Sequence, residues 1–264
     1  MKNSMLSLLS LFFAVCCLQN GASAGTISKP VEYMDGETAL EGFLAYDESA
    51  AKSSAPAVII VHEWNGPGDY VKSRALQIAA MGYVAFCADI YGKDVRPKTR
   101  EESAKTSSIY KSDRQLLRRR AGLAFSEVKK IKFVDPKRIA VMGYCFGGGA
   151  ALELARSGAE LAGAVSFHGN LDTKTPEDAK NIKCRILILH GADDPSVPPA
   201  QVAAFKKEMD DARVDWQMVS YGGAVHAFTN PASGNDASRG AAYNEKADKR
   251  SFEALKVFLK EIFN

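Results

Sequence analysis

Three absences in the sequence exclude whole classes of protein. No apolar run is long enough to cross a bilayer, because the longest, residues 5–18, has 14 residues, whereas a hydrocarbon core of ~30 Å needs roughly 20. Excess charge is missing as well: 34 basic residues nearly cancel 31 acidic ones, so nothing electrostatic indicates nucleic acid or an anionic membrane as a partner. No internal repeat or low-complexity segment is visible, and 46% hydrophobic with 25% charged residues is an ordinary globular composition. A disordered chain, a collagen-like repeat and a disulfide-scaffold miniprotein are thereby excluded.

The short apolar run near the N-terminus has the pattern of an export signal. Lys2 precedes it, and Ala22 and Ala24 supply small residues at the two positions that a signal peptidase reads. We therefore expect residues 1–24 to be a secretory signal peptide cleaved before Gly25, and residues 25–264 to be a periplasmic or secreted domain without membrane attachment. A lipoprotein signal is the main alternative, but the residues before the two cysteines of this run fit a lipobox poorly.

Cysteine is scarce in the rest of the chain. Only Cys87, Cys145 and Cys184 follow residue 24, and three thiols cannot all pair with one another. An exported protein meets an oxidising compartment, where an even number of paired cysteines would be expected. At least one thiol stays free, and a free thiol outside the cytoplasm calls for an explanation.

Strand and helix patterns alternate along residues 25–264. Residues 27–34 and 40–46 flank a turn signal, Asp35-Gly36, and are predicted to form an antiparallel hairpin. Further strands are predicted at 57–62, 83–88, 138–142, 162–167, 185–190 and 215–221, and helices at 69–81, 100–132, 147–157, 199–212 and 243–263. This alternation predicts one doubly wound α/β domain with a mostly parallel sheet. The basic run at 118–120 is interpreted as the solvated face of a helix.

The strand predicted at 138–142 leads into Gly143-Tyr144-Cys145-Phe146-Gly147, where a helix begins. G-x-C-x-G between a strand and a helix is the nucleophile-elbow pattern, with cysteine in the place of the usual serine. The glycines suit a sharp, strained turn on which side chains would collide with neighbouring backbone. The positive end of the new helix favours the thiolate form of Cys145. On this motif alone, a glycine-rich turn with a buried, inert cysteine remains the alternative.

A cysteine nucleophile needs a base, and the sequence has only four histidines. His62 and His190 end predicted buried strands and suit structural roles, and His168 is a minor candidate that also ends a strand. His226 lies in the loop after the last predicted strand, where an α/β-hydrolase carries its catalytic histidine. His226 is therefore the predicted base.

The group that orients the base should follow the preceding strand, where Asp193 and Asp194 compete. The G-x-x-D-x-x-V spacing over residues 191–197 favours Asp194. The order cysteine, aspartate, histidine is that of α/β-hydrolases and argues against papain-like enzymes. A class I glutamine amidotransferase shares the elbow, but it expects a carboxylate two residues after the histidine, where this chain has Phe228.

On these motifs the chain resembles the dienelactone hydrolase (carboxymethylenebutenolidase) family over residues 30–262. The most specific pieces are the segments 62–66 (HEWNG) and 88–92 (ADIYG), the elbow, and the loops that contain Asp194 and His226. The resemblance implies an α/β-hydrolase fold and a triad of Cys145, His226 and Asp194. It also implies that neither a metal nor an organic cofactor is needed.

The resemblance assigns roles to three further residues. Glu63 matches a glutamate of the family that interacts with the resting thiol. The resemblance implies that the thiol is held neutral until the substrate moves this glutamate and frees the thiolate. The alternative role for Glu63 is to fix the conformation of its loop. The backbone N–H groups of Trp64 and Phe146 are expected to form the oxyanion hole. No side chain is needed for that role, so these two residue types are free to differ from the family.

The chain departs from the family at the substrate. Where dienelactone hydrolases bind the substrate carboxylate with two arginines, this sequence has Lys93 and Asn230. Lysine keeps the charge but loses the bidentate fork, and asparagine loses both. Arg96 is a possible substitute. We therefore expect the reaction type to carry over better than the substrate, with weak selectivity for carboxylate-bearing lactones.

The sequence predicts a hydrolase of small esters or lactones that forms an S-acyl intermediate on Cys145. Its expected partner is a small-molecule substrate, and a monomer is the favoured state. A reactive-thiol, redox-sensing protein is the main alternative, and a non-catalytic binding module is a third. A sensor needs neither His226 nor Asp194 in register, so the intact triad favours the enzyme.

Overall fold

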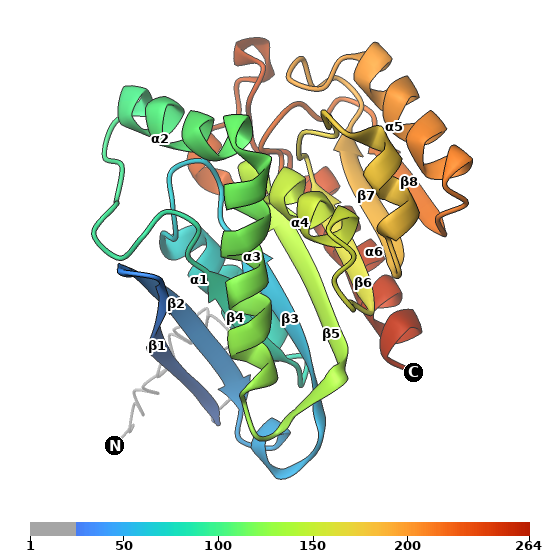
Figure 1. Ribbon diagram of the computed structural model, residues 1–264. Helices are drawn as coiled ribbons and strands as arrows, with labels where there is room; N and C mark the ends of the chain where they lie inside the picture. The colour runs from blue at the N-terminus through green and yellow to red at the C-terminus, as the bar shows by residue number, and fades with distance from the viewer. Residues whose placement is uncertain (1–24) are drawn as a thin grey trace, which may run out of the picture.

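The computed structural model describes residues 25–264, so the predicted signal peptide lies outside the described residues. An eight-stranded sheet forms the centre of the fold, with strand order β1-β2-β4-β3-β5-β6-β7-β8 (Figure 1). Its strands are β1 (Thr26–Asp35), β2 (Thr38–Asp47), β3 (Ala55–Val61), β4 (Val84–Ala88), β5 (Val134–Tyr144), β6 (Gly163–Phe167), β7 (Arg185–Gly191) and β8 (Trp216–Tyr221). Strands β1 and β2 form the expected antiparallel hairpin, β2 pairs antiparallel with β4, and all other pairs are parallel. The predicted α/β-hydrolase architecture is thus confirmed.

Helices cover both faces of the sheet. They are α1 (Asp69–Ala79), α2 (Arg100–Ser112), α3 (Arg114–Lys129), α4 (Phe146–Arg156), α5 (Pro199–Asp211) and α6 (Glu245–Phe263), with short 3-10 turns at Ala50–Lys52, Pro176–Asn181, Pro231–Ser233 and Ala237–Arg239. Helices α1 and α6 pack on one face, whereas α3, α4 and α5 pack on the other and α2 leans on α3 (Figure 1).

The burial of the central strands explains their continuous apolar sequences. Ile59 and Val61 of β3 point into the core under α3 and α4, and Val58 and Ile60 point into the core under α1 and α6. Because both faces are covered, each side chain of the strand is buried whichever way it points. Helix α4 lies at the centre of its layer, and all of its residues are buried, so the turn that precedes it is rigidly supported.

Most predicted boundaries differ from the structure by one or two residues, and three of the differences have a local cause or mark a longer element. The single helix expected over 100–132 is two helices, because Asp113 leaves the helical conformation and its side chain accepts a hydrogen bond from the Leu116 N–H. The strand expected at 138–142 extends over Val134–Tyr144, with a register irregularity where it pairs with β3. The last helix begins at Glu245, since Asn244 is its N-cap.

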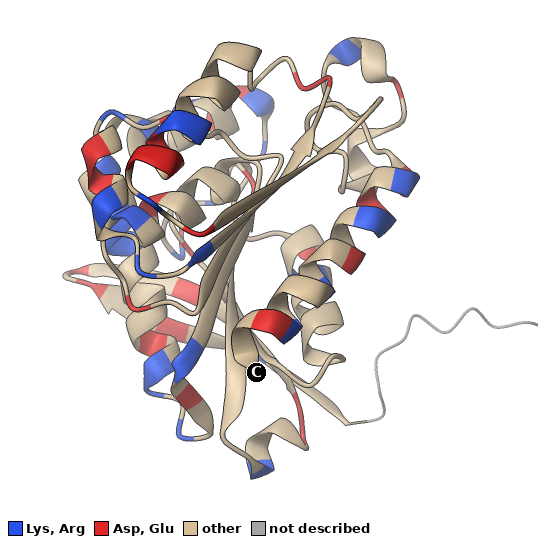
Figure 2. Cartoon of the chain, turned by 90° about the vertical axis from the view of Figure 1, so that its right-hand side faces the viewer, with Lys and Arg blue, Asp and Glu red and all other residues tan. Residues whose placement is uncertain are grey.

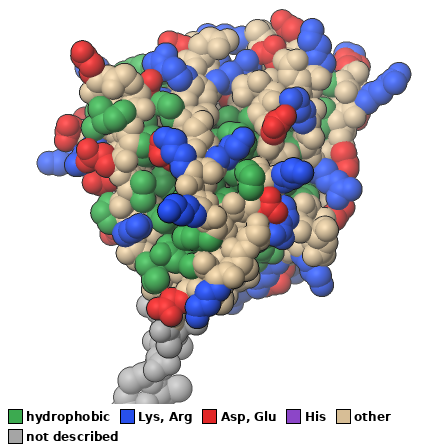
Figure 3. All heavy atoms as spheres, turned by 60° about the horizontal axis from the view of Figure 1, so that its bottom comes forward, with side chains coloured by type: hydrophobic (Ala, Val, Ile, Leu, Met, Phe, Trp, Pro, Cys, Tyr) green, Lys and Arg blue, Asp and Glu red, His purple; other side chains and the backbone are tan. Residues whose placement is uncertain are grey.

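Charges of both signs are spread over the surface. Figure 2 shows basic and acidic residues interspersed along the helices, and the lower face of the molecule mixes hydrophobic, basic and acidic side chains (Figure 3). Within residues 25–264, none of the helices combines the length and the apolar character that a bilayer span requires.

Candidate active site

Cys145 occupies a strained turn between β5 and α4. Its backbone lies at φ +55° and ψ −117°, a conformation that costs a non-glycine residue free energy and that is typical of functional sites. The turn is tight enough to need glycine on both sides. A Cβ on Gly143 would lie 2.0 Å from the Gly147 carbonyl oxygen, and a Cβ on Gly147 would lie 2.2 Å from the Val61 carbonyl oxygen. The G-x-C-x-G spacing therefore has a steric cause.

The structure brings Cys145, His226 and Asp194 together from three different loops. The Cys145 Sγ lies 3.0 Å from His226 Nε2, and His226 Nδ1 lies 2.8 Å from Asp194 Oδ2. These loops follow β5, β7 and β8, whose carboxyl ends meet at one edge of the parallel sheet. The arrangement is that of a nucleophile, a base and the group that orients the base.

The charge state of His226 depends on its two partners. Burial disfavours the imidazolium ion, but the negative charge of Cys145 and the hydrogen bond with Asp194 outweigh it and raise the pKa of His226 to about 10. A proton that leaves the thiol is therefore retained by the imidazole. His226 is therefore placed to take the proton of the Cys145 thiol.

The two neighbouring aspartates are separated by their surroundings. The Asp194 side chain is fully buried, and its second oxygen accepts a hydrogen bond from the Ser196 N–H at 2.8 Å. Asp193 is exposed and accepts a hydrogen bond from the Gly223 N–H at 3.1 Å, so it stabilises the turn between two loops. Only Asp194 contacts His226.

His168, the minor candidate for the base, contacts the backbone of the elbow and not the sulfur. Its Nδ1 accepts a hydrogen bond from the Cys145 N–H at 3.2 Å, and its Nε2 lies 2.7 Å from the Thr229 hydroxyl, which lies 2.6 Å from the Tyr70 hydroxyl. Burial holds the pKa of His168 well below its usual range, so the imidazole is neutral and can accept from the Cys145 amide. Sequence reasoning missed this network, because its members come from α1, β6 and the loop after β8 and share no spacing signal.

Glu63 and Asn230 form a buried pair beside the triad. The Asn230 amide donates to Glu63 Oε2 at 2.6 Å, and burial raises the pKa of the Glu63 carboxyl group. The sulfur of Cys145 is hydrogen-bonded to His226, and the side chain of Glu63 is hydrogen-bonded to Asn230. Glu63 was expected to interact with the resting thiol of Cys145. In this structure its hydrogen-bond partner is Asn230 instead.

Two backbone amides are available beside the sulfur. Phe146 is the first residue of α4, directly after Cys145, and Trp64 lines the same cavity as Cys145. Within the described part of the chain, neither N–H has a hydrogen-bond acceptor. Unpaired backbone amides are what an oxyanion hole requires.

Lys93 is not brought to the site. Its ammonium group is exposed and pairs with Glu32 of β1, at a distance from the residues that line the cavity of Cys145. Arg96, the suggested substitute, binds the buried carboxylate of Asp89 at 3.2 Å and the carbonyl of Gly92. Lys93 points away from the cavity because the segment after β4 turns toward the β1–β2 hairpin, where the Lys93 N–H donates to the Ala39 carbonyl.

The cavity onto which Cys145 and His226 open is called here the active-site cleft. It has a volume of about 740 Å³ and is also lined by Glu63, Trp64 and Asn230. Its basic lining residues are Lys98, Arg100, Lys111 and Arg239, and Glu63 is the one acidic residue of the lining. Sequence analysis missed these four cations, since none lies in a motif. Within residues 25–264, no group of three or more histidine, cysteine or acidic side chains is placed to hold a metal ion.

Comparisons with known proteins identify the family of the chain. Residues 40–263 match the Dienelactone hydrolase family. The crystal structure of a dienelactone hydrolase-like promiscuous phosphotriesterase from metagenomic libraries is similar, with a TM-score of 0.85 at 36% identity over 91% of this chain and 100% of that chain. Protein usf of Aquifex pyrophilus is 28% identical over 215 residues, which are 76% of this chain and 86% of that protein.

A further relative, from a Bradyrhizobium species, is named Probable 2-oxo-3-(5-oxofuran-2-ylidene)propanoate lactonase. It is 26% identical over 208 residues, which are 75% of this chain and 84% of the relative. The family match covers most of the described residues, including the elbow and the loops of Asp194 and His226. The chain therefore belongs to the dienelactone hydrolase family of α/β-hydrolases.

Proposed function

We propose that this protein hydrolyses small carboxylic esters or lactones with Cys145 as nucleophile, His226 as general base and acid, and Asp194 as the group that orients His226. The observation that carries the proposal is the continuous line of contacts from Sγ to imidazole to carboxylate, at 3.0 Å and 2.8 Å, with Cys145 and His226 lining the active-site cleft. Relatives whose names include dienelactone hydrolase and lactonase support this reaction class.

The first half-reaction acylates the enzyme. The thiolate attacks the carbonyl carbon, and the carbonyl oxygen becomes an oxyanion that the N–H groups of Trp64 and Phe146 bind. The tetrahedral intermediate collapses, the carbon–oxygen bond of the ester breaks, and the leaving alkoxide takes the proton that His226 holds. An S-acyl enzyme and an alcohol result; with a lactone, the alcohol stays attached to the acyl chain.

The second half-reaction releases the acid. Neutral His226 takes a proton from a water molecule, and the hydroxide attacks the thioester carbonyl. The carbon–sulfur bond then breaks and restores the thiolate beside the imidazolium. The raised pKa of His226 supports the first half-reaction, because the imidazole holds the proton until the leaving alkoxide takes it.

The redox-sensing alternative receives less support. A sensor needs an exposed, acidic thiol and commonly a second cysteine close by. Here Cys145 is only partly exposed, and the other two described cysteines, Cys87 and Cys184, are buried and free. A hydrolytic role also uses His226, Asp194 and the two free amides, for which a sensor has no need.

We further propose that residues 1–24 direct export and are removed before Gly25. The support is the basic start, the short apolar core and the small residues before the cleavage position. N-terminal sequencing of protein recovered from the periplasm or the medium tests this proposal. A chain that stays in the cytoplasm with an uncut N-terminus would refute it.

A panel of lactones and aryl esters, assayed with residues 25–264 and with Cys145→Ala, tests the proposed reaction. We expect turnover of several members and a loss on the order of 10³-fold or more in the variant. If the whole panel is inert, or if Cys145→Ala keeps its activity, the proposed reaction is wrong.

A further inference from the structure

A second cavity adjoins the active-site cleft. It has a volume of about 360 Å³ and shares Lys111 and Asn170 with the cleft. One wall is the first turn of α4, including Phe146, whose N–H is one of the two free amides. The junction of α2 and α3, with Arg114, also lines it. This second cavity is called here the basic recess.

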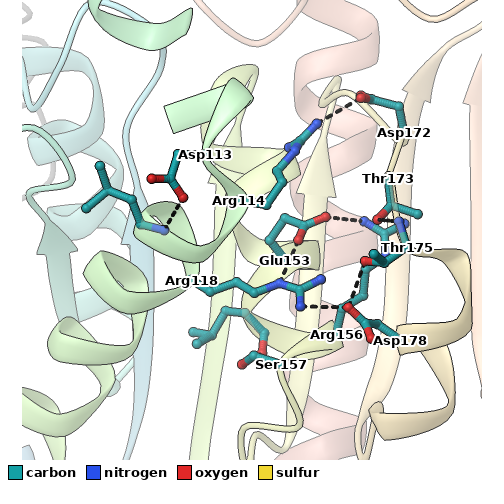
Figure 4. A network of polar contacts seen from close by, with 12 residues as sticks. Asp113, Arg114, Arg118, Glu153, Arg156, Ser157, Asp172, Thr173, Thr175 and Asp178 are labelled. Atoms are coloured by element: carbon teal, nitrogen blue, oxygen red, sulfur yellow. Dashed lines mark hydrogen bonds and ion pairs between the residues drawn. The ribbon is translucent and has the colours of Figure 1, made fainter. Parts of the chain in front are cut away.

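Cations outnumber carboxylates in the basic recess. Lys111, Arg114 and Lys174 line it, and Asp172 is the one acidic residue of the lining. Asp172 is already bound to the Arg114 guanidinium at 2.8 Å, as Figure 4 shows. Among residues 25–264, neither Lys111 nor Lys174 has a carboxylate partner. Two positive charges thus remain unneutralised around one small cavity.

The carboxylates behind the recess are not available to these lysines. Arg118 binds Glu153 at 2.8 Å and Asp178 at 2.7 Å, and Glu153 is also bound by Arg156, in the network drawn in Figure 4. The Nε of Arg114 is buried without an acceptor. The positive charge of the lining is therefore not cancelled by carboxylates from deeper in the fold.

The remaining lining suits a carbon chain that ends in an anion. Leu117 and the ring of Phe146 provide apolar contact near the elbow. Gln201 accepts a hydrogen bond from the Leu171 N–H through its Oε1 at 3.1 Å, which leaves its NH2 group as a donor. A lining that combines apolar side chains with ammonium and amide donors is complementary to a carboxylate on an aliphatic arm.

We propose that the basic recess binds a terminal carboxylate on one arm of the ester or lactone substrate, with Lys111 and Lys174 as its cationic partners. The proposal rests on the proposed function, since it places the scissile carbonyl at Cys145. The sequence analysis expected weak selectivity for a substrate carboxylate, because Lys93 and Asn230 replace two arginines. The proposal differs because its cations come from other places, α2 and the loop after β6. Lys111 lines both cavities, so an arm that passes Asn170 stays within its reach.

Activated half-esters of dicarboxylic acids test the proposal. One series consists of p-nitrophenyl half-esters with increasing methylene chain length, each with a free carboxylate at the other end. In the neutral control series a methyl ester replaces that carboxylate. The kcat/KM values of the two series are compared after subtraction of the uncatalysed rate. The variants are Lys111→Met and Lys174→Met, which keep an apolar stem and remove the charge. Lys105→Met is the matched control, because Lys105 is an exposed lysine of the same helix as Lys111 and lines neither cavity.

We expect a preference for the free acid that appears only with arms long enough to reach the recess. Each of Lys111→Met and Lys174→Met should lower that preference about 5-fold, as for exposed ion pairs, and Lys105→Met should leave it unchanged. Equal kcat/KM for acid and methyl ester at every length would overturn the proposal, as would a preference that survives both substitutions. If Lys174→Met alone leaves the preference for the free acid unchanged, the role of Lys174 is to cap α2 by donating to the Ser112 carbonyl, and the two-lysine site is wrong.

A binding measurement separates this proposal from the proposed function. Calorimetry with the Cys145→Ala variant and a long dicarboxylate, compared with its half methyl ester, needs no turnover. Tighter binding of the dicarboxylate that Lys111→Met weakens supports the recess even if all esters are inert. Hydrolysis of neutral esters without any effect of the second carboxylate keeps the reaction and removes the subsite.

Discussion

The two aspartates after β7 are adjacent in the chain but differ in burial and in partner. Asp194 is buried and bonded to His226, whereas Asp193 is exposed and bonded to a backbone amide of the next loop. Asparagine in place of Asp194 removes the charge that orients and stabilises the imidazolium ion. The same change at Asp193 leaves the imidazole untouched.

We expect Asp194→Asn to lower kcat on the order of 10²–10⁴-fold and Asp193→Asn to leave most activity intact.

The dependence of kcat/KM on pH should also change in Asp194→Asn. The imidazolium ion persists up to the raised pKa of His226, about 10, and is lost above it, so turnover of an alkyl ester, whose alkoxide needs that proton, should fall above pH 10. Without Asp194 the opposing effect of burial lowers this pKa, and the fall should begin at lower pH. Profiles of kcat/KM against pH decide the matter; an unchanged profile, or a larger loss in Asp193→Asn, would reassign the acid.

The three described thiols should differ sharply in reactivity. Burial raises the pKa of Cys87 and of Cys184 to about 12, and the Cys87 thiol donates to the Val71 carbonyl at 3.3 Å. Cys145 is partly accessible and lies beside an imidazole. Iodoacetamide followed by peptide mapping should label Cys145 on the order of 100-fold faster than the others. First labelling of Cys87 or Cys184 would show that the reactive thiol has been misassigned.

Sequence reasoning reached the residues that sit in motifs and missed those that do not. Cys145, Asp194 and His226 follow strands at the same edge of the sheet, so their convergence could be predicted from chain order. Lys93 also stands in a recognisable segment, yet its side chain pairs with Glu32 outside the cleft. Lys111 could not be predicted, because it enters the site only through the break between α2 and α3.

At the scale of elements, a buried ion-pair network joins α3, α4 and α5. Arg156 of α4 binds Glu208 of α5 through two hydrogen bonds, at 2.7 and 2.8 Å, and binds Glu153 at 3.1 Å. Glu153 in turn binds Arg118 of α3 (Figure 4). Buried charges are costly when one partner is removed, because the remaining charge stays desolvated.

Arg156→Met should therefore lower the free energy of unfolding by about 3–5 kcal/mol, measured by chemical denaturation. Lys207→Met is the control, since Lys207 pairs with Asp211 on the exposed face of α5 and its loss should leave stability essentially unchanged. Equal effects of the two substitutions would mean that the buried network does not stabilise the helix layer.

The apolar patterns of the sequence predicted where the strands and helices lie more accurately than where they begin and end. The strands buried on both faces read as continuous apolar runs, and each was found. The missed boundaries lie at single polar residues such as Asp113 and Asn244, whose capping role depends on the backbone conformation that tertiary packing selects. A helical pattern that continues across a cap hides the break.

At the scale of the whole molecule, the fold follows from the alternation of elements and the handedness of their connections. Parallel strands joined by helices can be covered only by placing those helices on both faces, and the hairpin at the N-terminus extends one edge. The alternation thus predicted a doubly wound α/β domain, whereas the α/β-hydrolase fold was expected from the family resemblance, and the family match agrees with it. The monomeric state and export remain predictions, because the first depends on surface complementarity and the second on residues outside the described chain.

The central claim is that an acyl group passes through the sulfur of Cys145. Rapid quenching of the protein with an activated aryl ester, followed by intact mass measurement and peptide mapping, tests it most directly. We expect one acyl adduct on the peptide that contains Cys145 in the unmodified sequence, and no such adduct in Cys145→Ala. An adduct on another residue, or ester hydrolysis at the full rate in Cys145→Ala, would contradict the account.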